Sequence, residues 1–470
     1  MIFTSLAFMI FFTVVIIGTF IIQLCFNDRA KFYFLLTASY FFYGWWDWRF
    51  CFLLLFVTIT SYITALQSQN KTAYITGVSV PLIVLGIFKY FNFFLDFFLD
   101  SIAHITGHEL ITLKIILPVG ISFYTFQALS YVIDVHRKKI PAEKDFIRLA
   151  LYISFFPQLV AGPIVRASDF LPQLYESSRR ITAENFSHGI QLMAVGFFKK
   201  AVLADHLSVF VDDVFRVPAA FHWATIILAV FSYSLQIYFD FSGYSDIASG
   251  CAKCLGYDFS INFNLPYISS SITEFWRRWH ISLSGWLRDY LYIPLGGNRK
   301  GIIRQHINLM ITMLLGGLWH GANWTFVFWG GLNGLALCCE KVYAGHEKKK
   351  ANFFVSLIKI LCVFMFISFT WIFFRALNFS DAWLILKGIF TLQNGIVQPF
   401  IWSFIAFALL ILSEISAVLK SRRENLTYIQ GFCPVMNLSS IPGLTAFFVF
   451  VGIILGLAFT GENPFIYFQF

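Results

Sequence analysis

Apolar segments of membrane-spanning length recur along the whole chain, and they constrain its fold more than any other feature. A helix needs about 20 apolar residues to cross about 30 Å of hydrocarbon. Shorter apolar runs lie near 31–43, 146–161, 305–317 and 381–391. The longer runs lie at about 4–26, 48–66, 73–99, 111–134, 189–204, 222–250, 323–343, 351–374, 398–420 and 441–460. They predict an all-α polytopic membrane protein with roughly 10–13 transmembrane and re-entrant helices.

The composition supports this prediction. Hydrophobic residues make up 58% of the 470 residues, charged residues only 13%, and the mean hydropathy is +0.72. The first apolar segment has no basic region before it and no small-residue cleavage site after it, so we expect a retained helix. We find no repeat and no long Gly/Ser linker, which predicts one integral membrane domain over residues 1–470.

The positive charge is spread over short loops. The net charge is +9, and its distribution is typical of the positive-inside rule rather than of nucleic-acid binding. The segments 27–31, 136–148, 277–304 and 420–423 are therefore predicted to be cytoplasmic. With 420–423 inside, the last helix would cross outward and leave the tail 461–470 extracytoplasmic. We expect a multi-pass protein of the cell (inner) membrane.

Two histidines lie between tryptophans at the edges of apolar segments. His280 stands in WRRWHISLS and His320 in LLGGLWHGANW. An ionisable group near the bilayer is costly and suggests a functional site. A neutral imidazole, with an ordinary pKa of ~6.5, can accept a proton from a hydroxyl and return one to a leaving group. Either histidine alone could be a packed core residue, but two in similar surroundings favour acid/base chemistry.

Polar residues also interrupt the apolar stretch 232–250. Gln236 and Asp240 would share one face of a helix, while Asp246 lies elsewhere. Such residues either join helices through hydrogen bonds or line a wet interior, and both interpretations stay open. Glycines around the histidines would allow close helix packing, at positions Gly316, Gly317, Gly321, Gly330, Gly331 and Gly334.

Several other chemistries lack their motifs. The sequence contains no GxSxG, P-loop, HExxH or GxGxxG pattern. Cys251 and Cys254 have CxxC spacing, but no second pair accompanies them, so we expect buried thiols. No residues with ligand spacing surround the two histidines, and we predict neither a metal nor a permanently bound cofactor.

Four sequence blocks resemble one known family over essentially the whole length. They are YFDFSGYSDIA (238–248), NFNLPYISSSITEFWRRWHISLSGWLRDYLYIPLGGNR (262–299), NLMITMLLGGLWHGANWTFVFWGGLNG (308–334) and NPFIYFQF (463–470). In these blocks the chain resembles the membrane-bound O-acyltransferase (MBOAT) family, in its bacterial alginate and peptidoglycan O-acetyltransferase branch.

The resemblance implies a fold, a donor and site residues. The fold would be a ring of helices around a central funnel and tunnel, the donor acetyl-CoA from the cytoplasm, the catalytic histidine His320 and the second histidine His280. Basic residues near the cytoplasmic mouth would attract the phosphates of the donor, or would only set topology. The donor-binding or tunnel candidates are Arg277, Arg278, Trp279, Arg288, Arg304, Asn323, Asp240, Gln236 and Trp319.

The C-terminal tail FIYFQF carries one hydroxyl, on Tyr467, between phenylalanines. It could anchor the last helix at the membrane interface. In the D-alanyl teichoic-acid system that the chain also resembles, the aromatic C-terminal peptide of a small partner carries an acceptor tyrosine. The same arrangement here implies a relay: Tyr467 attacks the thioester with His320 as general base, and the acetyl group then passes to an extracytoplasmic SGNH-type partner. That partner would esterify a polysaccharide, with peptidoglycan expected first and alginate or another exopolysaccharide open.

Three alternatives remain at this point. A D-alanyl transferase of the teichoic-acid type would use the same fold with another acyl group. A transporter could use the intramembrane Asp, Gln and His residues as a proton relay, although we find no inverted repeat. A membrane scaffold for a polysaccharide-modifying complex would need no chemistry of its own.

Overall fold

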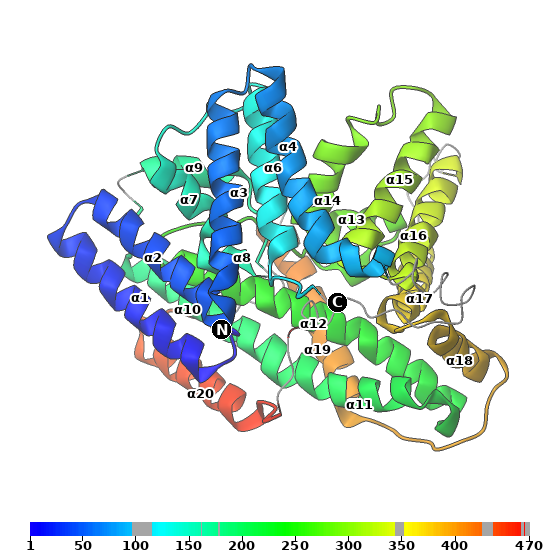
Figure 1. Ribbon diagram of the computed structural model, residues 1–470. Coiled ribbons are helices and arrows are strands. Elements are labelled where there is room, and N and C mark those ends of the chain that lie inside the picture. The colour runs from blue at the N-terminus through cyan, green and yellow to red at the C-terminus, as the bar shows by residue number, and fades with distance from the viewer. Residues whose placement is uncertain are drawn as a thin grey trace. The chain divides into compact units, whose positions relative to one another are not determined.

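The computed structural model describes residues 1–95, 115–160, 162–176, 179–343, 352–424, 436–461 and 465 (Figure 1). In these residues the regular secondary structure is helical, apart from one isolated parallel bridge between Phe221 and Ile396. Within the described ranges, five helices have the length and hydropathy to cross a membrane: Leu6–Cys25, Arg49–Leu66, Lys71–Leu95, Trp223–Cys254 and Phe353–Arg375. The prediction of an all-α polytopic membrane protein is confirmed.

The described residues group into two compact units. Unit 1 comprises Met1–Ile190 and Ala248–Ser260, and unit 2 comprises Gln191–Ile247 and Ile261–Phe470. The helices α10 and α12 contribute residues to both. The single membrane domain over 1–470 stays a prediction.

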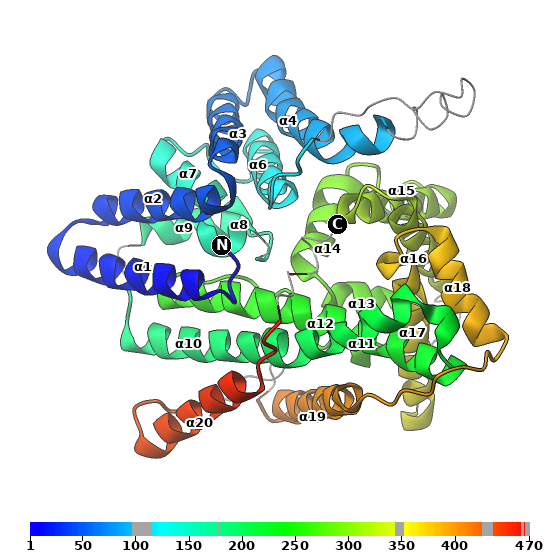
Figure 2. The ribbon, with the colours of Figure 1, turned by 60° about the horizontal axis from the view of Figure 1, so that its bottom comes forward.

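Unit 1 is built from the first helices of the chain. They are α1 (Leu6–Cys25), α2 (Asp28–Asp47), α3 (Arg49–Leu66), α4 (Lys71–Leu85), η1 (Gly86–Tyr90), α6 (Ile121–His136), α7 (Phe146–Ser154), α8 (Phe156–Leu159), α9 (Ala167–Tyr175) and the first part of α10 (Ala183–Phe197). The helices α3, α4 and α6 pack side by side, and α2 packs on α7 and α8 (Figures 1 and 2). Every residue of α6 from Ile121 to Val135 is buried, so α6 is the central helix of this unit.

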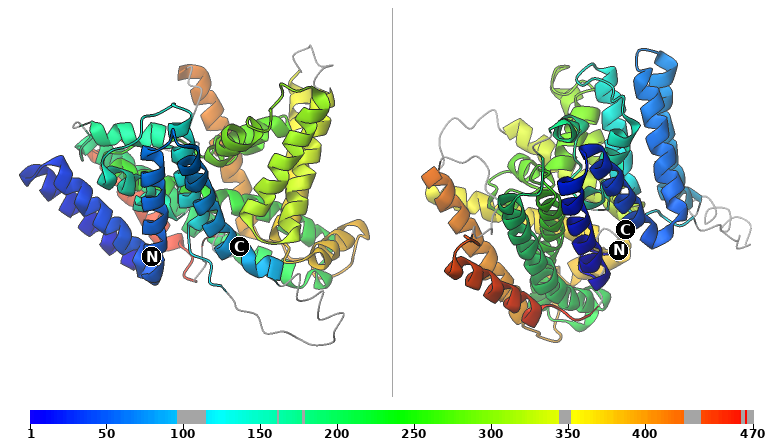
Figure 3. Two further views of the ribbon diagram at one scale, coloured as in Figure 1. Left: turned by 45° about the horizontal axis from the view of Figure 1, so that its top comes forward. Right: turned by 90° about the vertical axis from the view of Figure 1, so that its left-hand side faces the viewer.

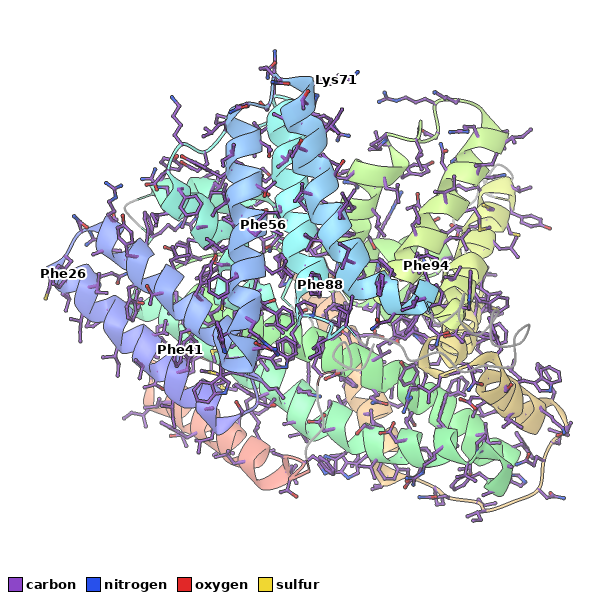
Figure 4. All side chains as sticks on the ribbon, in the orientation of Figure 1. Phe26, Phe41, Phe56, Lys71, Phe88 and Phe94 are labelled. Carbon is purple, nitrogen blue, oxygen red and sulfur yellow. The ribbon has the colours of Figure 1, made fainter. Side chains whose placement is uncertain are left out.

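Many large apolar side chains of unit 1 point outward. Phe26, Phe41, Phe56 and Phe94 are all exposed (Figure 4). A soluble protein rarely exposes so many large apolar side chains. In a chain with helices of this length, such side chains fit contact with lipid tails.

Unit 2 holds the rest of the chain. Its elements are the end of α10, η2 (Phe198–Ala204), α11 (Asp205–Arg216), η3 (Pro218–Ala220), most of α12 (Trp223–Cys254), η4 (Pro266–Ile268), α13 (Ile272–Arg278), α14 (Ile281–Leu287), η5 (Arg288–Tyr292), α15 (Ile302–His320), α16 (Trp324–Tyr343), α17 (Phe353–Arg375), α18 (Phe379–Phe390), α19 (Ile401–Glu424) and α20 (Ile441–Leu457).

The helices α15 and α16 form a tight hairpin (Figures 2 and 3). Glycine permits this approach at two positions. A Cβ atom at Gly317 would overlap the carbonyl oxygen of Phe326, and one at Gly330 would overlap that of Met313. The close packing predicted for these glycines is therefore present, and it fixes the end of α15, where His320 lies.

A π-helix, η2, brings Lys199 and Lys200 against α12. The element η2 continues α10, and Gly196 of α10 lies in backbone contact with Gly243 of α12. A π-helical turn shifts the backbone hydrogen bonds and often occurs at functional sites. The carbonyl oxygen of Ala201 in η2 accepts a hydrogen bond from the backbone N–H of Phe459, just after α20, at 2.9 Å. The C-terminal segment is thus tied to η2.

Candidate active site

His280 lies at a sharp turn between α13 and α14. Its backbone is left-handed, with φ 44°, an uncommon conformation for a residue other than glycine. Two backbone hydrogen bonds hold the turn against the segment before η4: Asn264 N–H donates to the carbonyl of Arg278, and Ile281 N–H to that of Asn262, both at 2.9 Å. The His280 residue is only 1% exposed. The chain therefore aims this imidazole inward at some cost in backbone energy.

Asn262 holds one nitrogen of the His280 ring. The Asn262 Oδ1 atom lies 3.1 Å from His280 Nδ1 and accepts hydrogen bonds from the backbone N–H and the hydroxyl of Ser282, at 3.2 and 2.8 Å. The Asn262 amide donates to Ser245 Oγ on α12 at 3.3 Å. Among the described residues, His280 Nε2 has no hydrogen-bond partner. One ring nitrogen is thus held and the other is left open.

His320 ends α15 inside a cluster of aromatic rings. Its ring centre lies 5.0 Å from Trp319, 5.2 Å from Trp329 and 5.3 Å from Phe374, each edge to face. His320 is 6% exposed. The Trp319 ring also lies 6.1 Å from that of His280. Trp319, predicted as a tunnel residue, therefore contacts both histidines.

The surroundings keep His280 neutral. Burial lowers the pKa of His280, which lies outside the candidate membrane-spanning helices, because desolvation disfavours its charged form. The rings of Phe241 and Phe263 lie 4.6 and 6.5 Å from its own. A neutral imidazole keeps a lone pair on one nitrogen, so the site can accept a proton or a hydrogen bond.

The C-terminal tail reaches the same neighbourhood. Phe465 is fully buried, and its ring stacks on that of Tyr244 at 4.2 Å and lies 5.8 Å from that of Phe241. Phe241 is the ring that packs edge-on against His280. Tyr467, the predicted acyl acceptor, lies outside the described residues.

Some of the other predicted residues are buried in unit 2. Trp279 is 2% exposed, with its ring 5.1 Å from that of Trp371. Gln236 is buried on α12. The carboxylate of Asp240 forms an ion pair with Lys200 at 2.7 Å, and Lys200 forms a second ion pair with Asp205, also at 2.7 Å. The face of α12 that the sequence marks as polar is therefore partly occupied by a charge network.

The remaining donor-binding candidates divide between local partners and the surface. Arg278 pairs with Glu274 at 2.9 Å, and Arg288 pairs with the adjacent Asp289 at 2.7 Å. Asn323 caps α16, since its Oδ1 accepts from the backbone N–H of Thr325 at 3.0 Å. The side chains of Arg277, Arg288 and Arg304 are exposed. Donor binding by any of them stays a prediction.

Two residues of this region carried no sign of their role in the sequence. Asn262 stands in NFNLPY, where only the left-handed turn at His280 brings its amide to the imidazole. Lys200 lies near the end of the apolar run 189–204, where a lysine is common in a membrane helix. The spacing of Lys200 and Asp240, forty residues apart, gives no signal for an ion pair.

The comparisons with known proteins agree with this architecture. The family model of the membrane-bound O-acyltransferases (MBOAT) matches residues 140–379. A probable alginate O-acetylase, AlgI, of Pseudomonas aeruginosa is 41% identical over 404 residues, which are 83% of this chain and 75% of the relative. A peptidoglycan O-acetyltransferase of Helicobacter pylori is 38% identical over 395 residues, 77% of this chain and 74% of the relative. A teichoic acid D-alanyltransferase of Bacillus subtilis is 27% identical over 285 residues, 57% of this chain and 69% of the relative.

The chain belongs to the membrane-bound O-acyltransferase family. It is a multi-pass membrane acyltransferase. His280 and His320 both lie within the residues that the family model matches. The resemblance seen in the sequence is confirmed, and the family sets aside the transporter and the scaffold.

Proposed function

We propose that this chain is an O-acetyltransferase of the cell (inner) membrane that takes the acetyl group of cytoplasmic acetyl-CoA and passes it outward to a polysaccharide of the cell envelope. The observation that carries the proposal is the pair of buried imidazoles, His280 and His320, which both pack against the ring of Trp319. General-base help from such a group accelerates acyl transfer by about 10² to 10⁴-fold.

The polymer class follows from the relatives. Those with 38–42% identity carry names for alginate or peptidoglycan acetylation. Peptidoglycan is our first choice, and alginate or another exopolysaccharide is second. The D-alanyltransferase relative is less similar, at 27% identity, which favours acetyl over D-alanyl. We assign the polymer-modifying step to an extracytoplasmic SGNH-type partner.

The acetyl group crosses the membrane on the chain's own tail. In this relay the Tyr467 oxygen bonds to the acetyl carbon, the carbon–sulfur bond of the thioester breaks, and the phenol proton ends on the coenzyme thiolate. The family resemblance gives the role of general base to His320. Support for the relay comes from Phe465, two residues before Tyr467, which is buried against Tyr244 and Phe241. A tail that served only as an interfacial anchor would have no need to bury this ring beside Phe241.

The decisive experiment feeds labelled acetyl-CoA to the purified protein and analyses the C-terminal peptide by mass spectrometry. The expected result is one acetyl group on Tyr467, absent from Tyr467→Phe and from His320→Ala. Coenzyme A release with an unlabelled tail and a labelled partner would leave an acetyltransferase without the tyrosyl relay. If no coenzyme A is released and the protein instead transfers D-alanine from a carrier protein, the chain is a D-alanyl transferase and acetyl-CoA is not its donor.

A further inference from the structure

The π-helix η2 offers a backbone carbonyl to a segment far away in the sequence. In an α-helix the N–H of Asp205 would donate to the carbonyl of Ala201, four residues back. In η2 it donates to the carbonyl of Lys200, five residues back. The Ala201 carbonyl accepts from the backbone N–H of Phe459 at 2.9 Å. This hydrogen bond, which follows the end of α20, is the first anchor of the C-terminal segment (436–461).

Ion pairs support the π-helical turn that makes this acceptor available. Lys200 and Asp205 are five residues apart, which is one turn of a π-helix, and their ion pair at 2.7 Å joins the two ends of that turn. Lys200 also pairs with Asp240 of α12 at 2.7 Å. The Ala201 carbonyl is therefore presented by an element that side chains hold against a neighbouring helix.

A side chain of α10 holds the beginning of the same segment. Gln191 is 3% exposed, and its Nε2 donates to the carbonyl of Met436 at 3.1 Å while its Oε1 accepts from the Met436 N–H at 2.7 Å. One amide thus binds both backbone groups of Met436, and this pair of hydrogen bonds is the second anchor. Met436 precedes α20 and Phe459 follows it, so α20 is fastened at both ends to the continuous element α10–η2.

Aromatic contacts lie between the two anchors. The Phe198 ring of η2 lies 5.6 Å from that of Phe450 in α20. The His206 ring of α11 lies edge-on to Phe459 at 5.5 Å and stacks on Trp402 of α19 at 4.1 Å. Apolar contacts between helices in lipid have no hydrophobic driving force of their own, and hydrogen bonds add specificity. The anchors therefore determine the position of α20 along η2, which apolar packing alone leaves free to slide.

We propose that α10 and η2 position the C-terminal segment for acyl transfer through both anchors, with Gln191 as a positioning residue. The inference rests on the proposed function, in which the end of the chain delivers the acyl acceptor. It leaves the general base at His320. The anchors bind backbone groups, so they act on where the segment lies and take no part in the chemistry.

The ring of Phe465 shows why this position matters. It is fully buried against Tyr244 and Phe241 of α12, and Phe241 packs edge-on against the ring of His280. If α20 slid along η2, this end of the chain would move away from the histidines. The anchors lie on elements other than those that carry the histidines, so we expect them to affect kcat and not the KM for acetyl-CoA.

The kinetic test measures coenzyme A release from acetyl-CoA by purified full-length variants. Gln191→Met keeps the volume of the side chain and removes both hydrogen bonds to Met436, and we expect kcat to fall by about 3- to 10-fold with KM unchanged. The matched control is Gln393→Met, because the Gln393 amide also binds backbone carbonyls, those of Pro218 and Phe221, at 3.0 and 2.8 Å. An unchanged kcat in Gln191→Met, or an equal loss in the control, would overturn the positioning role.

The other anchor is tested by two substitutions of one residue. Proline has no N–H, so Phe459→Pro cannot donate to the Ala201 carbonyl. Phe459→Ala keeps this donor and loses only the ring that packs on His206. We expect kcat to be lower in Phe459→Pro than in Phe459→Ala by about 3- to 10-fold. Equal values would mean that the hydrogen bond to Ala201 does not position the segment.

Hydrogen exchange covers the case in which these variants do not fold, and it needs no turnover. In the wild-type protein the amides of Met436 and Phe459 should exchange about 10-fold or more slowly than that of the exposed Thr460, since each is hydrogen-bonded. Exchange as fast as that of Thr460 would refute the anchors, even in a protein that releases coenzyme A. Protected amides in a protein that releases no coenzyme A would refute the proposed function, and with it the role in transfer, but not the anchors.

Discussion

Two regions of unit 2 bury ionisable groups in opposite ways. Around η2 and α12, Lys200 is bound by Asp205 and Asp240, each at 2.7 Å, and Lys199 by Asp246 at 2.6 Å. Around Trp319, by contrast, the two imidazoles of His280 and His320 pack against aromatic rings. The first region compensates its charges locally, as buried charges must. The second holds two buried imidazoles among aromatic rings, and imidazole is the side chain that acid/base chemistry near neutral pH uses most often.

The largest expected effect is on the aromatic side of this comparison. His320→Ala and His280→Ala should each lower acetyl transfer by about 10² to 10⁴-fold with little change in thermal unfolding, measured by coenzyme A release and by melting in detergent. The matched control is His222→Ala, because His222 lies in the loop before α12. This variant should keep its activity. Equal loss of activity and of folded protein would mean that these histidines are packing residues.

The next effect falls on the charged side. Lys200→Met leaves Asp205 and Asp240 buried without their shared cation, and we expect a destabilisation of about 3–5 kcal/mol, seen as a lower melting temperature. Lys341→Met, an exposed lysine at the end of α16, should change little. A stable but inactive Lys200→Met protein would mean that the ion pairs of Lys200 take part in acetyl transfer. The contrast between the two regions would then be wrong.

A smaller effect tests the support beneath His320. Gly330→Ala pushes a methyl group into the Met313 carbonyl of α15, and overpacking of this kind costs about 1–3 kcal/mol. Gly452→Ala in α20, where a Cβ meets open space, is the control and should be near neutral. Thermal melting of both variants measures the difference, and equal melting temperatures would contradict the tight hairpin.

The smallest effect concerns Asn323. Loss of its cap should cost about 1 kcal/mol and leave KM for acetyl-CoA unchanged. Asn352→Ala is the control for the cap alone, since Asn352 Oδ1 accepts from the N–H of Val355 at 3.0 Å, whereas Asn323 Nδ2 also donates to the Leu377 carbonyl at 2.7 Å. A raised KM in Asn323→Ala alone would show that Asn323 contacts the donor and that the donor site extends beyond the two histidines.

The sequence predicted the elements of this molecule better than their contacts. Helices over Leu6–Cys25 and Phe353–Arg375 follow from apolar length, which needs no partner. The tryptophan-rich surroundings of His280 and His320 indicate a functional role, while their placement in one site is implied only by the family resemblance. The spacing of Gln236 and Asp240 predicts a shared helix face and makes Asp240 a tunnel candidate. The sequence does not predict that Lys200, on a π-helix, pairs with Asp240.

Asn262 shows the same limit more sharply. Its role depends on a backbone turn with positive φ at His280, a residue type that rarely takes this conformation. Local propensity does not predict such a turn, because tertiary hydrogen bonds from Asn264 and Ile281 impose it. Residues that position a functional group through such a turn are therefore the ones that a sequence hides.

The hydrogen bond between Phe459 and Ala201 has a stoichiometric consequence. It fixes one end of the last segment, and Phe465 fixes a second point six residues later. On the proposed relay the acceptor is part of the same chain, so it stays at a high effective concentration that does not depend on the concentration of the protein. With Tyr467 as that acceptor, each molecule carries one, and without a partner the reaction should stop after a burst of one coenzyme A per chain.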